Sequence, residues 1–429
     1  MASYSEMTAE QLAEQQAALL VRYNDYKSRE LSLDITRGKP GADQLELSMS
    51  MLDALNSKSG YTDCNGVDCR NYGGVIGIPE ARQLFASVFD VSMDEIIVGG
   101  NSSLNMMFDT ISSAMGNGLL GGEPWAKQGR VKFLCPCPGY DRHFAICEYF
   151  DIEMIPIKNT PTGPDMDEVE RLVQSDPLVK GIWCVPKYSN PTGITYSDET
   201  VMRFARLKPA AKDFRIFWDN SYFVHHLFGE DVKLLNLLKE CEKYGNGNMV
   251  YMYFSTSKIT FPGAGLAGMA TSVENVKAIT HRMGIQTIGP DKLNQLRHMK
   301  FIKDYDGLLA QMSRHAEIIR PKFLCVLETL EKELEGFDVA TWTKPDGGYF
   351  ISLDTMKGCA KRTYDLCLDA GVKLTKVGAT FPYGKDPDDT NIRIAPTFPT
   401  LEELELAIEV LCVCVKLAAI EKLLEKAGK

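Results

Sequence analysis

The stretch from about residue 80 to 275 alternates short apolar runs with segments of helical pattern, which restricts the fold more than any other feature of the chain. Most of these runs lack strict apolar–polar alternation, which is typical of strands buried on both faces. Strands that alternate with helices indicate a largely parallel sheet covered by helices on both sides. We therefore predict an α/β fold whose large domain holds a mostly parallel, seven-stranded sheet. The seven runs are EIIVGG (95–100), RVKFLCP (130–136), DIEMIPI (151–157), VKGIWCVP (179–186), FRIFWDN (214–220), MVYMYFS (249–255) and LAGMATS (266–272).

Helix signals lie on either side of this region. Thr8 and Gln11 fit a capping box for a helix that continues to about Tyr26, and Thr400 and Glu403 fit another. The second helix is expected to be apolar on one face. The last hundred residues have the pattern of a smaller α+β unit. We predict an N-terminal helix and substrate loop (1–50) that join the small domain, a large cofactor-binding domain (51–310) and a small C-terminal domain (311–429).

Composition restricts the cellular compartment and the classes of binding partner that we expect for the chain. The net charge of −10 disfavours nucleic-acid binding, which requires clustered Lys and Arg. The twelve cysteines show neither a disulfide framework nor CxxC spacing, and the polar start lacks the pattern of a signal peptide. No apolar run is long enough to span a bilayer. We expect a cytoplasmic protein that binds no membrane, no nucleic acid and no metal.

Polar and aromatic residues gather where the predicted strands end, which is where open α/β sheets bind their ligands. Each has an ordinary explanation by itself: a helix cap, a packed aromatic, a turn, or a lysine whose amine reaches solvent. Burying the lysine charge would be costly without a partner. The residues are Ser102 and Ser103, Tyr140, Asn190, Asp219 with Tyr222, and Lys258.

Taken together, these residues supply what pyridoxal 5′-phosphate (PLP) requires. That cofactor needs a lysine for its Schiff base, an aspartate against its pyridinium nitrogen and donors around its phosphate. The helix start at Ser102 offers free N–H groups and hydroxyls to a phosphate. We therefore predict a PLP site at this edge of the sheet, with Lys258 as the Schiff-base lysine.

Six motifs, taken in order and spacing, carry a resemblance to a known family. They are NYGG…GIPEAR, CPGYDRHF, PKYSNPTG, FWDNSYF, STSK and NIRIAP. Over nearly its whole length the chain resembles class I PLP aminotransferases of fold type I. It is most similar to the divergent aspartate aminotransferase subgroup that is related to the effector domains of MocR-type regulators.

The resemblance implies a role for each matching residue. Lys258 would bind the cofactor and move protons, and Asp219 would keep the ring nitrogen protonated. Asn190 and Tyr222 would contact the phenolic oxygen of the ring, with Tyr222 counted among the catalytic residues, and Tyr140 would stack on the ring. Other roles implied are the phosphate ligands Ser102, Ser103, Ser255 and Ser257, the phosphate contact Tyr72 from a neighbouring subunit, and the substrate contacts Arg393, Asn190 and Gly38.

Tyr72 in that role implies a homodimer with shared active sites. Arg393 would clamp the substrate α-carboxylate in the bidentate geometry that a guanidinium favours. The chain departs from the family pattern at Leu266, where many members carry an arginine at the cofactor phosphate. Hydroxyls and backbone N–H groups would have to replace that arginine.

The expected function is ping-pong transfer of an amino group from an amino acid, with aspartate as the favoured donor, to 2-oxoglutarate. An aromatic or broad-range aminotransferase, or a PLP-dependent lyase or racemase on the same fold, is the alternative. A MocR-type regulator is disfavoured, since only some 30 residues precede the DITRGKP loop. The roles of His143 and of His225–His226 stay open. A dicarboxylic substrate needs a second cation, for which the candidates are Arg37, Lys39, Arg142, Lys187 and Arg297.

Overall fold

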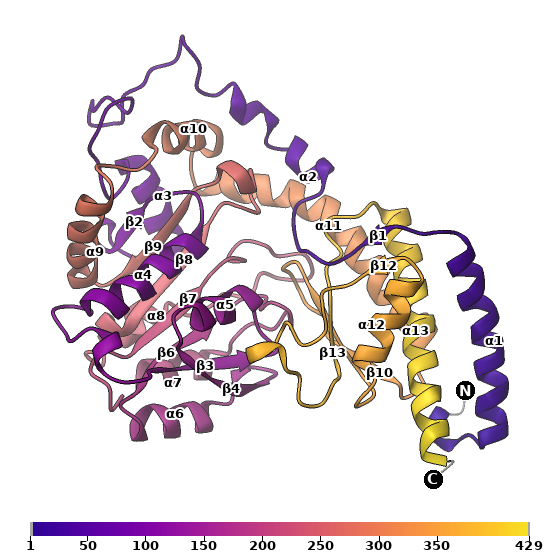
Figure 1. The fold of residues 1–429 in the computed structure, drawn as a ribbon. Coiled ribbons are helices and arrows are strands. Elements are labelled where there is room, and N and C mark those ends of the chain that lie inside the picture. Colours follow the sequence, from indigo (N-terminus) through magenta and orange to yellow (C-terminus); the bar gives the residue numbers. More distant parts are fainter. Residues whose placement is uncertain (1–2, 428–429) are drawn as a thin grey trace.

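The computed structural model describes residues 3–427 and contains an eight-stranded sheet (Figure 1). All seven predicted strands are confirmed. The eighth strand, β5, has two residues and lies at the edge, antiparallel to β4; a segment that short carries no pattern in the sequence. Strand β9 runs antiparallel to both of its neighbours, and the pairs from β8 to β4 are parallel. The strands, in spatial order, are β2 (Ile96–Val98), β9 (Ala267–Thr271), β8 (Val250–Ser255), β7 (Arg215–Asp219), β6 (Val179–Cys184), β3 (Lys132–Cys137), β4 (Glu153–Thr160) and β5 (Gly163–Pro164).

Helices cover both faces of this sheet. Along β7, Ile216 and Trp218 pack into one hydrophobic cluster and Phe217 packs into another, which explains why the strands lack polar alternation. One cluster includes residues of α3 (Pro79–Phe89), α6 (Met166–Ser175), α7 (Asp198–Ala205), α8 (Leu237–Glu242) and α10 (Lys292–Ile302). The opposite cluster includes residues of α4 (Ser103–Asn117), α5 (Asp141–Tyr149) and α9 (Val273–Gln286).

A smaller α+β unit packs beside the large sheet. Its sheet has the order β10 (Ala340–Trp342), β11 (Ile351–Thr355), β13 (Asn391–Ile394), all antiparallel. A separate parallel pair joins β1 (Leu33–Asp34) to β12 (Val372–Lys373). The remaining helices are α1 (Ala9–Ser28), α2 (Ala42–Glu46), α11 (Tyr305–Leu334), α12 (Ala360–Asp369) and α13 (Leu401–Ala427).

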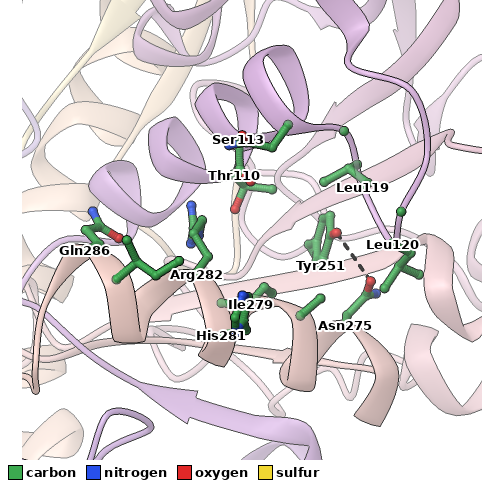
Figure 2. A pocket seen from close by; sticks show the side chains of 15 residues that line it. Thr110, Ser113, Leu119, Leu120, Tyr251, Asn275, Ile279, His281, Arg282 and Gln286 are labelled. Atoms are coloured by element: carbon green, nitrogen blue, oxygen red, sulfur yellow. Dashed lines mark hydrogen bonds between the residues drawn. The ribbon is translucent and has the colours of Figure 1, made fainter.

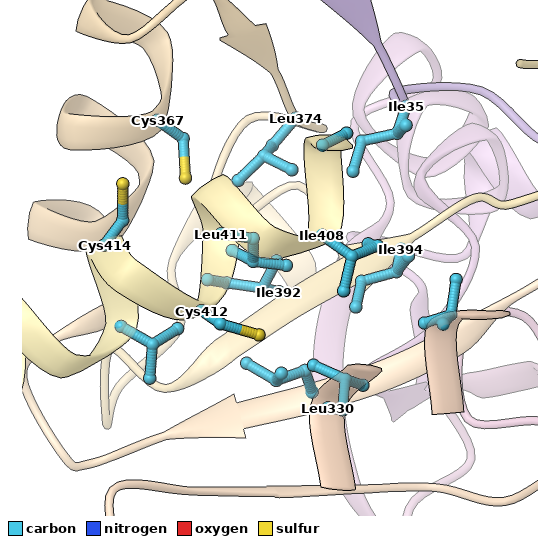
Figure 3. Packing of buried hydrophobic residues seen from close by; sticks show 14 of the residues in the cluster. Ile35, Leu330, Cys367, Leu374, Ile392, Ile394, Ile408, Leu411, Cys412 and Cys414 are labelled. Carbon is cyan, nitrogen blue, oxygen red and sulfur yellow. The ribbon is translucent and has the colours of Figure 1, made fainter. Parts of the chain in front are cut away.

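Helices α1 and α13 lie side by side at one end of the molecule (Figure 1). Both predicted capping boxes form, at Thr8 and at Thr400. The expectation of a single apolar face on α13 is wrong, because residues 410–420 are all buried. Three helices and the small sheet surround α13, and Figure 3 shows Leu411 and Cys412 packed toward β13 and α11.

Helix α11 joins the two parts of the molecule. Leu308 near its start belongs to a core cluster of the large sheet, and Leu330 near its end belongs to the core of the smaller unit. The predicted boundary at residues 310 and 311 falls inside this helix, and the three-part division stays a prediction. Within residues 3–427, no helix is long and apolar enough to cross a membrane.

Candidate active site

Asp219, the last residue of β7, is buried at the carboxyl edge of the large sheet, with 3% of its surface exposed. One carboxylate oxygen lies 3.1 Å from His143 Nε2 on α5, and the other accepts a hydrogen bond from Ser221 Oγ at 2.6 Å. The His143 ring stacks on Trp183 of β6, with 4.4 Å between the ring centroids. A buried carboxylate needs such partners, and here two strands and a helix hold them in place.

Lys258 follows the end of β8, the strand next to β7 in the sheet. Its Nζ lies 5.0 Å from the centroid of the Tyr222 ring and 5.8 Å from that of Tyr349. Burial lowers the pKa of the Lys258 amine, and the negative charge of Asp219 opposes that shift. Within the described chain, Lys258 Nζ has no hydrogen bond or ion pair to another side chain or carbonyl.

Two neighbours of this amine have shifted pKa values. Burial raises the pKa of the Tyr222 phenol well above its ordinary value, so this group stays protonated at neutral pH. His225 Nε2 lies 3.3 Å from the Lys258 carbonyl oxygen, and burial together with the Lys258 charge lowers the pKa of His225 well below 6.5. Lys258 is therefore surrounded by neutral rings, with Asp219 as the nearby acid.

Arg393 on β13 places a side chain of the smaller unit at the candidate active site. Its guanidinium donates through NH1 to Asp141 Oδ1 at 3.0 Å and to Asn190 Oδ1 at 3.2 Å. The guanidinium also lies 5.0 Å from the centroid of the Phe350 ring. A Cβ added to Gly38 would come within 2.4 Å of the same ring, so only glycine lets the loop at residues 36–40 approach it.

The predicted phosphate ligands lie on adjoining loops at the end of β2 and of β8. Ser102 is the N-cap of α4 but makes no side-chain capping bond, and Ser103 begins the helix. Asn101 Nδ2 contacts the Gly263 carbonyl at 3.4 Å, which joins this helix start to the turn after Lys258. Ser255 ends β8 and Ser257 follows it two residues later. The arrangement offers free N–H groups and hydroxyls to an anion.

Comparison with known proteins identifies the family of this chain. The family model described as aspartate amino-transferase matches residues 7–427. The chain belongs to this family. An aspartate aminotransferase of Corynebacterium glutamicum is 45% identical over 404 residues, which are 93% of this chain and 92% of that protein. The crystal structure of an aspartate transaminase from the same species has a TM-score of 0.96 at 43% identity, and covers 98% of this chain and 99% of the other.

A more distant aminotransferase shares the fold alone. The α-aminoadipate aminotransferase LysN of Thermus thermophilus, crystallised with N-(5′-phosphopyridoxyl)-L-leucine, has a TM-score of 0.74 at 18% identity, covering 92% of this chain and 95% of that one. The predicted fold is confirmed, and the chain is an aminotransferase of PLP fold type I.

In this aminotransferase, Leu266 occupies a structural position. Its side chain is 1% exposed within the core cluster, and its backbone N–H donates to Thr256 Oγ1 at 2.8 Å. His298 on α10 is close to Thr256 and Thr260 below the same turn, and Asn294 Nδ2 donates to the Ala264 and Gly265 carbonyls. Buried side chains therefore hold the turn after Lys258 in shape without a charged group at position 266.

The other predicted residues differ in how deeply they are buried. Tyr140, the N-cap of α5, meets His143 edge to face with 5.0 Å between the ring centroids; burial and the charges of Asp219 and Asp141 raise its pKa to about 12. Tyr72 is 79% exposed. Among the candidate second cations, Lys187 is buried and already paired with Asp231 at 2.6 Å.

Three contacts of the site were missed or left open by sequence reasoning. They are the pairing of Asp141 with Arg393, the His143–Asp219 contact and the placement of His225 against the Lys258 carbonyl. The first two could have been sought in YDRHF, which places an acid and a histidine directly after the predicted stacking tyrosine. The third carries no sequence signal, because it depends on how the chain turns after β7.

A cavity of about 550 Å³ lies elsewhere, between α4 and α9 (Figure 2). Thr110, Tyr251, Asn275 and Arg282 are among its lining residues. Tyr251 is near the start of β8, whereas Asp219 and Ser255 end their strands, so this cavity lies away from the candidate active site. The candidate active site lies at the carboxyl edge of the sheet, where open α/β sheets usually bind their ligands.

Proposed function

We propose that this aminotransferase uses PLP bound to Lys258 and transfers the amino group of aspartate to 2-oxoglutarate. The observation that carries the proposal lies at the ends of two adjacent strands, β7 and β8. Lys258, just after β8, has an amine with no hydrogen-bond or ion-pair partner among residues 3–427, and Asp219, at the end of β7, is a buried carboxylate with two hydrogen-bond partners. That donor set fits the cofactor, since an amine is needed for its aldehyde and a permanent anion for its ring nitrogen.

We call Lys258, Asp219, His143 and Tyr222 the ring end of the site, and Ser102, Ser103, Ser255 and Ser257 the phosphate end. When bound, the cofactor supplies an electron sink for the substrate Cα. Asp219 would hold the proton on the ring nitrogen. Tyr222 would donate its phenolic hydrogen to the phenolic oxygen of the cofactor ring, because its raised pKa keeps it neutral. Asn190 would contact the same oxygen, and Tyr140 would stack on the ring.

Lys258 is the proton carrier in this proposal. A base must be neutral to accept a proton, and burial lowers the pKa of this amine in that direction. The Lys258 amine would hold the cofactor through its aldehyde and, once free, would take up the proton of the substrate Cα and release it again within the same half-reaction. The neutral rings of Tyr222 and Tyr349 limit the access of water to it.

Aspartate is proposed as donor because the curated Corynebacterium glutamicum protein and the crystal structure from that species, both more than 40% identical to this chain, are named as aspartate aminotransferase and aspartate transaminase. Arg393 would bind its α-carboxylate, with Gly38 above the substrate. The second carboxylate needs another cation. Lys187 is already paired, so Arg37, Lys39, Arg142 and Arg297 are the remaining candidates.

We further propose a cytoplasmic homodimer with Tyr72 at the partner's phosphate. Its support is the exposure of apolar groups that a monomer would bury: Tyr72 at 79%, Ile285 at 80% and Ile288 at 59%. All twelve cysteines are free, as in a reducing compartment. Sedimentation of wild type and a Y72A variant tests the dimer; we expect two chains per particle in both, with weaker cofactor binding in Y72A.

A half-reaction titration tests the substrate. Protein loaded with PLP is mixed with one amino acid at a time, and the absorbance band of the lysine-bound cofactor is followed. We expect rapid loss of the band with aspartate and glutamate and slow loss with phenylalanine and alanine. Fast conversion by phenylalanine would show that the amino donor is an aromatic amino acid and not aspartate. Release of ammonia would indicate a lyase. Without any such band, the PLP assignment is wrong.

A further inference from the structure

Arg393 is paired with an acid of the chain itself, Asp141. Asp141, the first residue of α5, accepts from its NH1 at 3.0 Å, while Thr375 Oγ1 accepts from NH2 at 3.3 Å. The Arg393 side chain is 7% exposed and the Asp141 side chain is 31% exposed. The pair joins α5 of the large part to β13 of the smaller one.

This pairing conflicts with binding of a substrate carboxylate. A guanidinium grips a carboxylate through two parallel N–H groups. Three of the five N–H donors of Arg393 are used: both of those on NH1 and one on NH2. Nε is shielded from solvent and has no partner among residues 3–427, so a ligand can approach only through the terminal nitrogens. A second carboxylate beside Asp141 would also be repelled by its charge. The incoming carboxylate and Asp141 therefore compete for one guanidinium.

Arg142 offers Asp141 another partner. Its Nε lies 4.0 Å from Asp141 Oδ2, the oxygen that does not face Arg393. The Arg142 side chain is 52% exposed, and within residues 3–427 it makes no ion pair with any other acid. A rotation of the Asp141 side chain would shorten this contact and release Arg393 without leaving either charge unpaired.

We propose that Asp141 is a placeholder for the substrate α-carboxylate: it pairs with Arg393 in the free protein and moves to Arg142 when the substrate binds. This inference rests on the proposed role of Arg393. The exchange keeps the buried guanidinium paired and positioned between turnovers, which avoids the large cost of an unpaired buried charge. Because Asp141 competes for Arg393, both the amino acid and the 2-oxo acid bind more weakly than they would bind to an arginine without such a partner.

The test is the affinity of the PLP-loaded protein for succinate, a dicarboxylate without an amino group, measured by calorimetry. D141N keeps the shape but removes the competing charge, and should bind succinate about tenfold more tightly. R142Q removes the second partner and should bind about threefold more weakly. The effect of R142Q should vanish in the D141N background, because the two residues act through one contact. Steady-state kinetics should show the D141N effect as a lower KM for both substrates.

The R393K variant separates this inference from the function on which it rests. It loses the bidentate grip and should bind succinate about a hundredfold more weakly. If R393K weakens binding but D141N leaves it unchanged or weaker, Asp141 is a structural partner of Arg393 and the exchange is wrong. If R393K binds succinate like wild type, Arg393 is not the carboxylate clamp, and both assignments fall. Thermal unfolding of each variant confirms that α5 is still folded.

Discussion

At the ring end of the site, Asp219 is 3% exposed and both of its oxygens are hydrogen-bonded by side chains of the protein. At the phosphate end, Ser102 stands at the start of α4 without a side-chain capping bond. The Asp219 carboxylate at the ring end is thus fully paired by the protein itself, whereas the serine hydroxyls at the phosphate end have no hydrogen-bond partner among residues 3–427.

The difference follows from the charge that each end must stabilise. A carboxylate that tunes a ring nitrogen must be fixed and shielded from water, so that its field acts at full strength. An anion that arrives from solution instead needs unpaired donors, which a helix start and hydroxyls provide. Five experiments test this difference between the two ends and the residues that support them.

Replacing Lys258 by alanine is expected to have the largest effect. Both the covalent attachment and the proton carrier are lost, so turnover should fall by more than about 10⁴-fold. The absorbance band of the lysine-bound cofactor should be missing. The K258R variant is the matched control, because it keeps a cation but cannot form the bond. Turnover of K258A near the wild-type rate would show that another residue carries the chemistry.

Replacing Asp219 by asparagine should lower turnover by at least about 10²-fold, because the ring nitrogen loses its anion. H143Q should lower turnover about tenfold, because His143 is expected to act only by holding Asp219 in place. The double variant should lose about as much as D219N alone. Fully additive losses would show that His143 has a separate role, and that the ring end is not one unit.

An arginine at position 266 tests whether the phosphate end lacks a charge or has no room for one. Leu266 is packed in the core, so L266R should lower the free energy of unfolding by about 3–5 kcal/mol, the cost of an unpaired buried charge. L266M should cost less than about 1.5 kcal/mol. Thermal and denaturant unfolding of the cofactor-free protein give both values. Unchanged stability of L266R with tighter cofactor binding would show that the site accepts an arginine there.

His298, below the turn after Lys258, makes stability depend on pH. Burial lowers its pKa from 6.5 to about 4, so the unfolded chain takes up a proton at a higher pH than the folded one. Neutral His298 contributes about 3 kcal/mol to the free energy of unfolding above pH 6.5, and this contribution is lost as pH falls to about 4. H298Q should flatten the pH dependence of the unfolding temperature across this window. An equally steep dependence in H298Q would assign it to other groups.

The smallest effect is expected at the phosphate end. S102A removes one of several donors, so cofactor affinity should fall only about threefold to tenfold. S113A, on the same helix, should bind PLP like wild type. Equilibrium dialysis against PLP measures both. A fall in the cofactor affinity of S102A by about 10²-fold, as large as the fall in turnover expected for D219N, would mean that the phosphate end is as tightly specified as the ring end.

Much of this molecule could be predicted from its sequence. Seven strands follow from apolar runs, because a strand buried on both faces leaves a local signal. The placement of Lys258, Asp219 and Arg393 in one region follows from motifs whose order fixes their place in the family, and their roles stay predictions. The Asp141–Arg393 contact could not be predicted, since it joins residues 252 positions apart, one on helix α5 and the other on strand β13. The two-residue strand β5 and the continuous burial of residues 410–420 were also missed, because each depends on neighbours supplied by the tertiary fold.

The packing of α1 against α13 has a consequence for biosynthesis. The partner surface of α1 leaves the ribosome roughly 370 residues after α1 itself, which at about 5–20 residues per second is a delay of roughly 20–70 s. Most of the stability of a helix in a protein comes from tertiary packing of its apolar face. During that interval Leu12, Leu19 and Tyr23 lack the surface of α13, so the nascent chain presents an apolar stripe of the kind that chaperones hold.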